Sequence, residues 1–323
     1  MRALRWVAVA ALLLALASLA TFWRDWARRA PADAPAVEVT IPRGASVPAA
    51  GRILEAAGLV EDARRFAIAA RVAGSGRAIR AGDYAIPRGA GHRQILDILA
   101  SGRTIQRFVT IPEGLPSVLV AERLRAIDAL TGAIPVPREG SVLPDTYAYE
   151  RGEPRAAVLA RMQAAMERAL AEEWPRRSAR AWPRTPAEAV NLAAIIEKET
   201  AKASERRRIA GVYTNRLRAG MKLDADPTVI YPVTQGRPLG RRICQSELRA
   251  DTGWNTYVRP GLPRTPIANP GRASIRAALD PEPHDYLYFV ADGSGGHVFA
   301  RSYAEHRANV EKWFAIRRAK GEM

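Results

Sequence analysis

Asn191-Leu-Ala-Ala-Ile-Ile-Glu197-Lys-Glu199-Thr200 is the stretch around which this chain is organised. Just upstream, Thr185-Pro186-Ala187-Glu188 has the pattern of a helix start. A capping threonine is followed by a proline at the first helical position and by a glutamate three residues after the cap. We therefore expect a helix to begin here and to carry the whole stretch.

Successive residues of a helix are about 100° apart around its axis. On that wheel Glu197 falls among apolar residues, in line with Val190 and Ala193. The opposite, polar arc holds Glu188, Asn191, Lys198 and Glu199. We expect Glu199 to be solvated and Glu197 to point into the interior or into a cleft.

A charged carboxylate in an apolar wall is unfavourable, so burial should raise the pKa of Glu197. A raised pKa suits a general acid that works at neutral pH. The alternative is a purely structural role, in which a buried Glu197 pairs with one of the many arginines of the chain. The spacing alone does not choose between these two interpretations.

The chain has 323 residues, 48% of them hydrophobic, which is enough for a real core and more than one domain. The formal net charge of +16 fits a polyanionic partner, or an arginine excess spread over the surface. Cys244 is the single cysteine, which excludes an intramolecular disulfide. The four histidines show no metal-ligand spacing, and no Walker-type phosphate loop is present. We expect no metal and no cofactor.

The N-terminal region indicates a membrane anchor. Residues 1–5 carry two arginines, and residues 6–23 form an apolar run just long enough to cross a bilayer. Trp23 and Trp26 lie where an interfacial belt would be, so we place the anchor at residues 6–26. Ala15-Leu16-Ala17 could instead mimic a signal-peptidase site, but the apolar run continues beyond it. We expect an uncleaved span with a cytoplasmic N-terminus and a translocated body.

The remaining chain predicts an α+β protein. Residues 27–36 form a linker, and residues 37–102 show a β-α-α-β-α order whose size resembles a LysM-like wall-binding domain. Residues 103–323 form a second, mixed α+β domain, which is expected to carry the activity. Within it we expect a turn followed by a strand or short helix at 223–231, a stiff proline-rich loop at 260–271, a buried strand at 286–290 and a closing helix at 303–318.

Several blocks of the second domain carry a resemblance to a known family. They are Leu143-Pro-Asp-Thr-Tyr147, Ile195-Ile-Glu-Lys-Glu-Thr200, Ala203-Ser-Glu-Arg206, Asn215-Arg-Leu217, Asp226-Pro-Thr-Val-Ile-Tyr231, Asn255-Thr-Tyr257, Gly261-Leu-Pro263, Pro266-Ile-Ala-Asn-Pro-Gly271, Tyr286-Leu-Tyr-Phe-Val290 and Gly295-Gly-His-Val-Phe299. In this order they closely resemble the endolytic murein transglycosylase family (MltG or YceG-like), from about residue 38 to the end.

The resemblance implies a single-pass inner-membrane protein with a periplasmic body that cuts nascent peptidoglycan glycan strands internally and terminates their elongation. The MurNAc–GlcNAc β-1,4 bond would break without hydrolysis and leave a 1,6-anhydro-MurNAc end. Peptidoglycan synthases are further candidate partners. The family's catalytic glutamate corresponds here to Glu197, the residue that the helical wheel also selects.

One carboxylate suffices for this reaction, because the sugar's own 6-hydroxyl attacks the anomeric carbon. By family blocks and residue type, Asp226, Asn255 and Tyr257 are candidate substrate-binding residues, although Asp226-Pro227 could simply form a turn. The sequence departs from the family pattern at 232–251, and at Arg264 and Thr265, where proline and glycine are expected. These departures put the fit of the substrate in question more than the chemistry.

Two other functions remain open from the sequence. A wall-binding scaffold without catalysis would use the same domains, and it differs in not needing Glu197 for glycan cleavage. A membrane-tethered nucleic-acid binder would explain the positive charge and predicts salt-sensitive DNA binding. No dense basic tract with interleaved aromatic residues supports it, so we expect no nucleic-acid partner.

Overall fold

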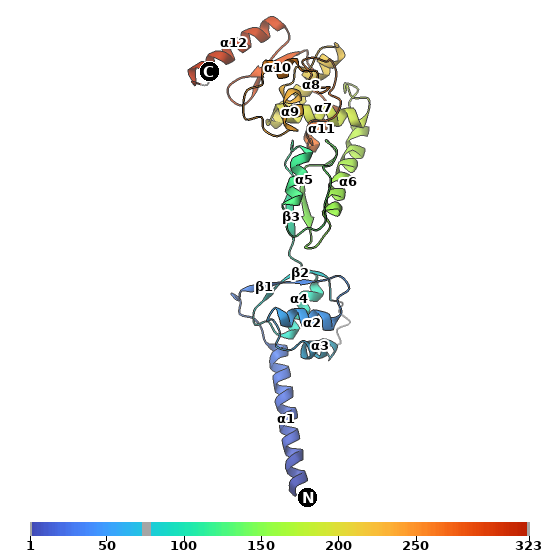
Figure 1. Cartoon of the computed structure of the whole chain (residues 1–323), viewed down its shortest axis with the longest axis vertical. Helices are drawn as coiled ribbons and strands as arrows, with labels where there is room; N and C mark the ends of the chain where they lie inside the picture. Colours follow the sequence, from blue (N-terminus) through green and yellow to red (C-terminus); the bar gives the residue numbers. More distant parts are fainter. Residues whose placement is uncertain (1, 73–78, 322–323) are drawn as a thin grey trace. The chain divides into compact units, whose positions relative to one another are not determined.

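The computed structural model describes residues 2–72 and 79–321. The chain is a mixed α+β protein that divides into two compact units. Unit 1 comprises the chain up to Arg107 together with residues 148–152, and unit 2 comprises residues 108–147 and 153–323. Each unit is described by itself below, with its elements labelled as in Figure 1.

Unit 1 begins with the long helix α1 (Arg2–Ala27). Its segment Val9–Ala27 is, by length and composition, long and apolar enough to cross a membrane. Asp25, in its last turn, is the one residue of that segment that is buried inside the protein. Leu12, Leu14 and Trp23 are among its exposed large side chains. An exposed apolar surface of this size needs a nonpolar surrounding, which fits the predicted span.

The rest of unit 1 has the predicted β-α-α-β-α order and a small core of its own. Strands β1 and β2 pair antiparallel, with Ala36 opposite Pro87 and Ile41 opposite Gly82. Helices α2 and α3 lie between these strands in the sequence, and Phe66 and Tyr84 are fully buried in the core. The elements are β1 (Ala36–Ile41), α2 (Val47–Ala56), α3 (Ala63–Val72), β2 (Gly82–Pro87) and α4 (His92–Ser101).

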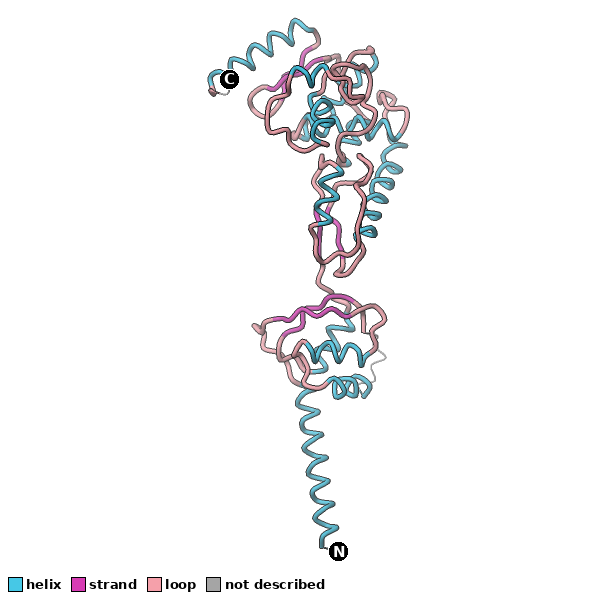
Figure 2. Tube along the Cα trace, viewed as in Figure 1, coloured by secondary structure: helices cyan, strands magenta, loops and turns pink. Residues whose placement is uncertain are grey.

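Unit 2 is mostly helical. Strands β5 and β6 pair antiparallel as a hairpin. Strands β3 and β4, each of which lies only partly within unit 2, form another two-stranded sheet. The segment between α9 and α11 is mostly loop, drawn pink in Figure 2. The elements are β3 (Arg107–Thr110), α5 (Ser117–Arg125), β4 (Thr146–Tyr149), α6 (Arg155–Glu173), η1 (Trp174–Arg176), α7 (Pro186–Glu199), η2 (Ala203–Glu205), α8 (Arg206–Arg218), α9 (Asp226–Thr234), α10 (Gln245–Arg249), α11 (Arg272–Leu279), β5 (Tyr288–Ala291), β6 (His297–Ala300) and α12 (Tyr303–Ala319).

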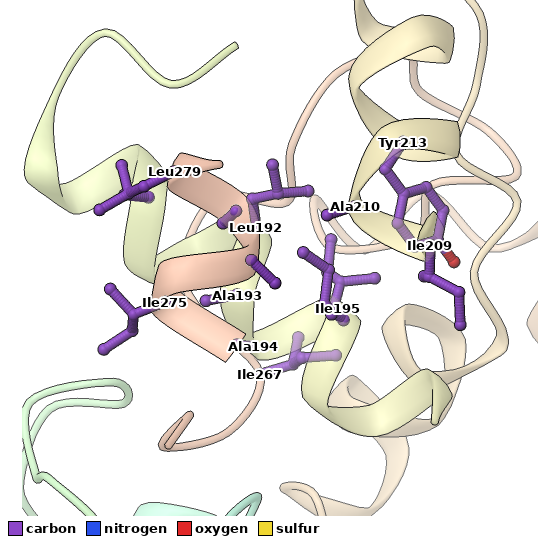
Figure 3. Close-up of a cluster of buried hydrophobic side chains, with 14 of the residues drawn as sticks. Leu192, Ala193, Ala194, Ile195, Ile209, Ala210, Tyr213, Ile267, Ile275 and Leu279 are labelled. Carbon is purple, nitrogen blue, oxygen red and sulfur yellow. The ribbon is translucent and has the colours of Figure 1, made fainter. Parts of the chain in front are cut away.

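The core of unit 2 is built around α7. Leu192 and Ala193 of α7 pack beside Ile275 of α11, while Ile195 lies next to Ile209 of α8 (Figure 3). Small alanine side chains on α7 let the neighbouring helices approach closely. Burying such aliphatic side chains contributes roughly 1.5–3 kcal/mol each for the larger ones. Since every residue from Ala189 to Ile196 is buried, α7 is firmly held in the unit.

The structure decides between two alternatives for one expected element and refines two others. The segment from Asp226 is a helix, α9, which continues past Pro232 to Thr234, so the short-helix alternative is confirmed and the strand alternative is wrong. Strand β5 begins only at Tyr288, and all four of its residues are half-buried rather than buried. Helix α12 has the expected position and a Ser302 capping box, but it has no buried residue.

Candidate active site

Helix α7 fixes the backbone of Glu197. Thr185 Oγ1 accepts the N–H of Glu188, and the Glu188 carboxylate accepts the N–H of Thr185, so the predicted capping box is formed. Every residue from Ala189 to Ile196 is buried. The next residue, Glu197, therefore projects from a helix that the core holds in place, which suits a carboxylate that must be positioned accurately.

The Glu197 side chain points inward, as the helical wheel predicts, and it is 5% exposed. Its Oε2 accepts the backbone N–H of Gly271 at 2.9 Å, and its Oε1 accepts a hydrogen bond from Arg206 Nη2 at 3.4 Å. Gly271 is the N-cap of α11, so the carboxylate lies at the positive end of that helix dipole. The arginine pairing expected of a structural glutamate is thus present, and two N–H donors stabilise the charged form.

A second carboxylate, Glu113, shares the same arginine. Arg206 Nη2 lies 3.1 Å from Glu113 Oε2, and the Glu113 side chain is 44% exposed. A Cβ atom added to Gly271 would overlap the Glu113 carboxylate. Glycine at position 271 is therefore what allows Glu113, Arg206 and Glu197 to meet at the start of α11.

A cavity of about 480 Å³ opens beside this group. Its lining includes Glu113, Gly114, Lys198, Tyr231 and Arg237. Gly114 connects the cavity to the buried carboxylate, since a Cβ added there would lie 3.4 Å from Glu197 Cγ. The cavity is within the size range of ligand pockets and is open to solvent. A glutamate with only a structural role would not need such a neighbouring space.

Tyr231 links the cavity to a buried acid. Its hydroxyl donates to Glu139 Oε2 at 3.1 Å, and the N–H of Ser117 donates to Glu139 Oε1 at 2.8 Å. Burial raises the pKa of Glu139, while these hydrogen bonds oppose the rise. Asn269 Nδ2 also lies 3.3 Å from Glu139 Oε1, so the wall of the cavity is tied to the loop that precedes α11.

An aromatic pair continues from Tyr231 toward the proline-rich loop. The Trp254 and Tyr231 rings lie 5.5 Å apart. The Arg264 guanidinium stacks over the Trp254 ring at 3.4 Å from its centroid, and Trp254 Nε1 donates to Thr265 Oγ1 at 2.9 Å. The two residues that depart from the family pattern in this loop, Arg264 and Thr265, therefore both contact Trp254.

The prediction for Glu199 is wrong. Its carboxyl is not freely solvated but accepts a hydrogen bond from the hydroxyl of Tyr213, which is itself fully buried in α8. Burial raises the pKa of Glu199 to about 7, the Tyr213 hydrogen bond lowers it, and the nearby Asp226 carboxylate raises it further. The two glutamates of α7 thus both face protein, each with a different partner.

Asn191, also placed on the polar arc, is buried as well. Its side chain is 7% exposed, and Nδ2 donates to the carbonyl oxygen of Pro263 at 2.6 Å. The contact joins α7 to the proline-rich loop. The bond satisfies the donor side of the amide, while Asn191 Oδ1 is buried without a hydrogen-bond partner among the described residues.

Two of the three candidate substrate residues lie together. The Tyr257 hydroxyl donates to Asp226 Oδ1 at 2.7 Å, and burial together with this bond raises the pKa of Tyr257. Asp226 is exposed at the start of α9, and its charge reaches Glu199. The Asp226 end of the pair is therefore accessible at the surface. Around Glu199, helices α7, α8 and α9 supply one residue each, namely Glu199, Tyr213 and Asp226.

Asn255 has a different environment. It is 2% exposed, and its Nδ2 donates to three carbonyl oxygens at the end of α10, those of Glu247, Leu248 and Ala250. Its Oδ1 accepts the N–H of Tyr257 at 2.9 Å. These contacts use both donors and the acceptor of the amide, so Asn255 holds the loop that presents Tyr257.

The sequence reasoning missed Glu113, Arg206 and Glu139 as members of the site. Glu113 follows a strand and precedes Gly114, whose φ of +72° marks a tight turn, and that Glu-Gly pair was the available signal. Glu139 gave no local signal, because its partners come from distant segments. Among the residues described, no group of three histidine, cysteine, aspartate or glutamate side chains is placed to hold a metal ion.

Comparison with known proteins gives consistent results. A curated Bacillus subtilis relative named endolytic murein transglycosylase is 27% identical over 316 residues, which covers 88% of this chain and 86% of the relative. A relative of the same name from Streptococcus pneumoniae D39 is 27% identical, with 85% of this chain and 58% of the relative covered.

A solved structure agrees with these relatives. The crystal structure of a YceG-like protein from Listeria monocytogenes matches with a TM-score of 0.52 and 26% identity, covering 85% of this chain and 99% of that one. The model of the YceG-like family matches residues 39–312, which include α7, the Glu113–Arg206–Glu197 group and the cavity. The chain therefore belongs to the YceG-like family.

Proposed function

We propose that this protein is a membrane-anchored endolytic lytic transglycosylase, a lyase that cleaves the MurNAc–GlcNAc bond of peptidoglycan glycan strands. The observation that carries the proposal is the position of Glu197. It is a buried carboxylate on a rigid helix, it has two N–H donors, and it adjoins an open cavity. The family and its relatives named endolytic murein transglycosylase supply the reaction class.

Glu197 acts first as acid and then as base. In its protonated form it gives its proton to the glycosidic oxygen as the bond to the anomeric carbon breaks. The resulting carboxylate then takes the proton of the sugar's 6-hydroxyl, whose oxygen bonds to the anomeric carbon and closes the 1,6-anhydro ring. The proton returns to Glu197, so the residue ends the cycle as it began, and no water is consumed.

The neighbours of Glu197 assist the first of these steps. The carboxylate that forms after proton transfer is the species that accepts hydrogen bonds from Gly271 N–H and Arg206. Donors already in place stabilise this charge without rearrangement, which lowers the barrier to its formation. Glu113 holds Arg206 from the solvent side and is a positioning residue in this scheme.

The glycan would occupy the cavity and extend along the surface beside it. Tyr257 and Asp226 offer an accessible hydroxyl–carboxylate pair for sugar hydroxyls. Trp254, which Arg264 and Thr265 hold in place beside Tyr231, offers an aromatic surface for a sugar ring next to the cavity. We assign Asn255 to fixing the Tyr257 loop, because its hydrogen bonds are made within the protein.

The proposal also places the protein in the cell. Helix α1 would be a single-pass anchor in the inner membrane, with a cytoplasmic N-terminus and a periplasmic body. The β1-α2-α3-β2 arrangement supports a LysM-like wall-binding role for the small domain. Peptidoglycan synthases are proposed partners, because a cut in a nascent strand must occur where the strand is made.

The test uses the full chain in neutral detergent with uncrosslinked glycan strands, and mass spectrometry of the products. Parent protein is compared with Glu197→Gln, which keeps the shape of the side chain but cannot donate or accept the proton. Glu167→Gln, an exposed change on α6, removes the same charge away from the site. We expect anhydro-ended fragments from the parent and from Glu167→Gln, and a rate at least a hundredfold lower from Glu197→Gln.

Other products would change the conclusion. Reducing ends that carry added water would mean hydrolysis, with Glu113 as the nearest second carboxylate. Cleavage that is unaffected in Glu197→Gln would refute the assignment of the acid. Retention on peptidoglycan without cleavage by any form would favour the non-catalytic scaffold.

A further inference from the structure

The end of α1 is fastened to the small domain of unit 1. The carbonyl oxygen of Arg28 accepts the N–H of Gly91 at 2.9 Å, and Gln94 Oε1 accepts the N–H of Ala30 at 3.0 Å. A Cβ on Gly91 would overlap the Arg28 carbonyl, so the start of α4 approaches α1 as closely as glycine allows. Trp26 packs against the core of the domain. The side chains at this end of α1 therefore have a defined place relative to α4.

A cavity of about 910 Å³ lies at this junction. Its wall combines the last turn of α1 and the residues after it with one side of α4. Four arginines line it, Arg28, Arg29, Arg93 and Arg103, against one acidic residue, Asp97. The indole rings of Trp23 and Trp26 complete the wall on the α1 side.

The four arginines carry charge that the described part of the protein does not neutralise. None of their side chains makes an ion pair or a hydrogen bond within residues 2–72 and 79–321, and all four are exposed. Elsewhere in unit 1 the pattern is different, since Arg107 contacts both Glu38 and Asp83. Four guanidinium groups that no described residue pairs, placed around one cavity, make a strong anion-binding surface.

The depth of this cavity follows from the length of α1. If the apolar segment crosses a bilayer, Trp23 lies at the interface where tryptophan is enriched. Arg28 comes five residues later, which at a rise of 1.5 Å per residue is about 7 Å along the helix axis. The headgroup layer on each side of a hydrocarbon core is about 5–7 Å thick. The arginines would therefore lie at the level of the lipid headgroups.

We propose that this cavity binds the phosphate-bearing headgroup of an anionic lipid in the leaflet from which the body emerges. The guanidinium fork matches phosphate oxygens in pairs, and the indole rings cover the apolar part of the glycerol region. Lipid headgroups are the anions that are always present at this level of the membrane. A soluble polyanion would have to displace a headgroup to reach the cavity. The bound headgroup joins α1 and α4 across the cavity and so holds the small domain against the membrane surface.

The test measures lipid retention by the full chain. Protein in a neutral detergent is titrated with phosphatidylglycerol or with phosphatidylcholine, and the bound lipids are counted by native mass spectrometry. We expect one or a few phosphatidylglycerol molecules to be retained in preference to phosphatidylcholine. In Arg93→Gln/Arg103→Gln, which leaves the α1 arginines and the span intact, the apparent affinity should fall about thirtyfold.

Matched variants separate the site from general charge. Arg52→Gln/Arg65→Gln removes two exposed arginines of α2 and α3 outside the cavity and should retain phosphatidylglycerol as the parent does. Arg93→Lys/Arg103→Lys keeps the charge and should recover most of the binding. Circular dichroism melts verify that all variants are folded.

Three outcomes would overturn the proposal. One is equal retention of the two lipids by the parent. Another is an equal loss of phosphatidylglycerol in the cavity and control variants, which would mean a non-specific charge effect. The third is complete displacement of the lipid by low millimolar inorganic phosphate, which would identify the cavity as a site for free phosphate. None of these readouts depends on glycan cleavage.

Discussion

Replacing Glu199 with glutamine should change how the stability of unit 2 depends on pH. The carboxyl is covered by protein and bonded to Tyr213, and burial raises its pKa from 4.5 to about 7. In the unfolded chain the group is ionised above pH 4.5, whereas in the folded protein it stays protonated until about pH 7. The folded state therefore holds one more proton than the unfolded state in this window, and stability falls as the pH rises through it.

The size of the effect follows from the two pKa values. Integrated from pH 5 to pH 8, the parent loses about 2.5 kcal/mol of unfolding free energy through this group. Glu199→Gln has no such ionisation, so its unfolding free energy relative to the parent should rise by the same amount over that interval. For a unit of this size, the gap in melting temperature should widen by about 5–10 °C.

The assay is thermal unfolding of the full chain in neutral detergent, followed by tryptophan fluorescence at pH 5, 6, 7 and 8. The glutamine also alters the bond to Tyr213, which shifts the melting temperature by an amount that does not depend on pH, so only the change of the gap with pH is diagnostic. Glu167→Gln provides the control, because it removes a carboxylate at an exposed position on α6. A gap for Glu199→Gln that is the same at all four pH values would refute the reasoning.

Two further predictions concern the same unit. Gly271→Ala should lower glycan cleavage severalfold at a stability cost of less than about 1 kcal/mol, because the new Cβ overlaps the exposed Glu113 carboxylate, which must turn away and then no longer holds Arg206; unchanged cleavage in the glycan assay would contradict this. Glu173→Gln should destabilise the protein by about 1–3 kcal/mol at pH 7, since hydrogen bonds from Arg276 and Arg272 lower the pKa of this buried acid. A group with a lowered pKa contributes stability above its unfolded pKa and loses it in acid. The difference in unfolding free energy between parent and Glu173→Gln should therefore shrink toward pH 4 in chemical denaturation. A difference that grows in acid would count against the assignment.

Patterns within a single helix predicted part of the site. The capping box and the direction of Glu197 depend on residues within fifteen positions of one another, and the structure has both. The wheel failed for Glu199 and Asn191, because it shows which residues share an arc but not what covers that arc. Tyr213 on α8 covers the first, and the Pro263 carbonyl, 72 residues away, binds the second.

The rest of the site required tertiary information. Glu113 reaches Arg206 across 93 residues, and Glu139 is held by Ser117, Tyr231 and Asn269 from three separate segments. No periodic pattern within one segment predicts contacts between segments this far apart in the sequence. The expected order of elements in the small domain was correct because it depends on alternation and turn residues, which are local signals.

The difference in secondary structure between the α7 core and the loop-rich segment after α9 has a consequence for how such proteins diversify. Glu197 is held by helices whose packing tolerates little change, whereas the segment from 235 to 271 is mostly loop and supplies Trp254, Arg264 and Tyr257. Loops accept insertions and substitutions at small thermodynamic cost. Changes at the exposed positions of this segment are therefore tolerated more readily than changes on α7, whereas the Asn191–Pro263 contact and the buried residues Ile267 and Asn269 limit how much of the loop can be exchanged between relatives.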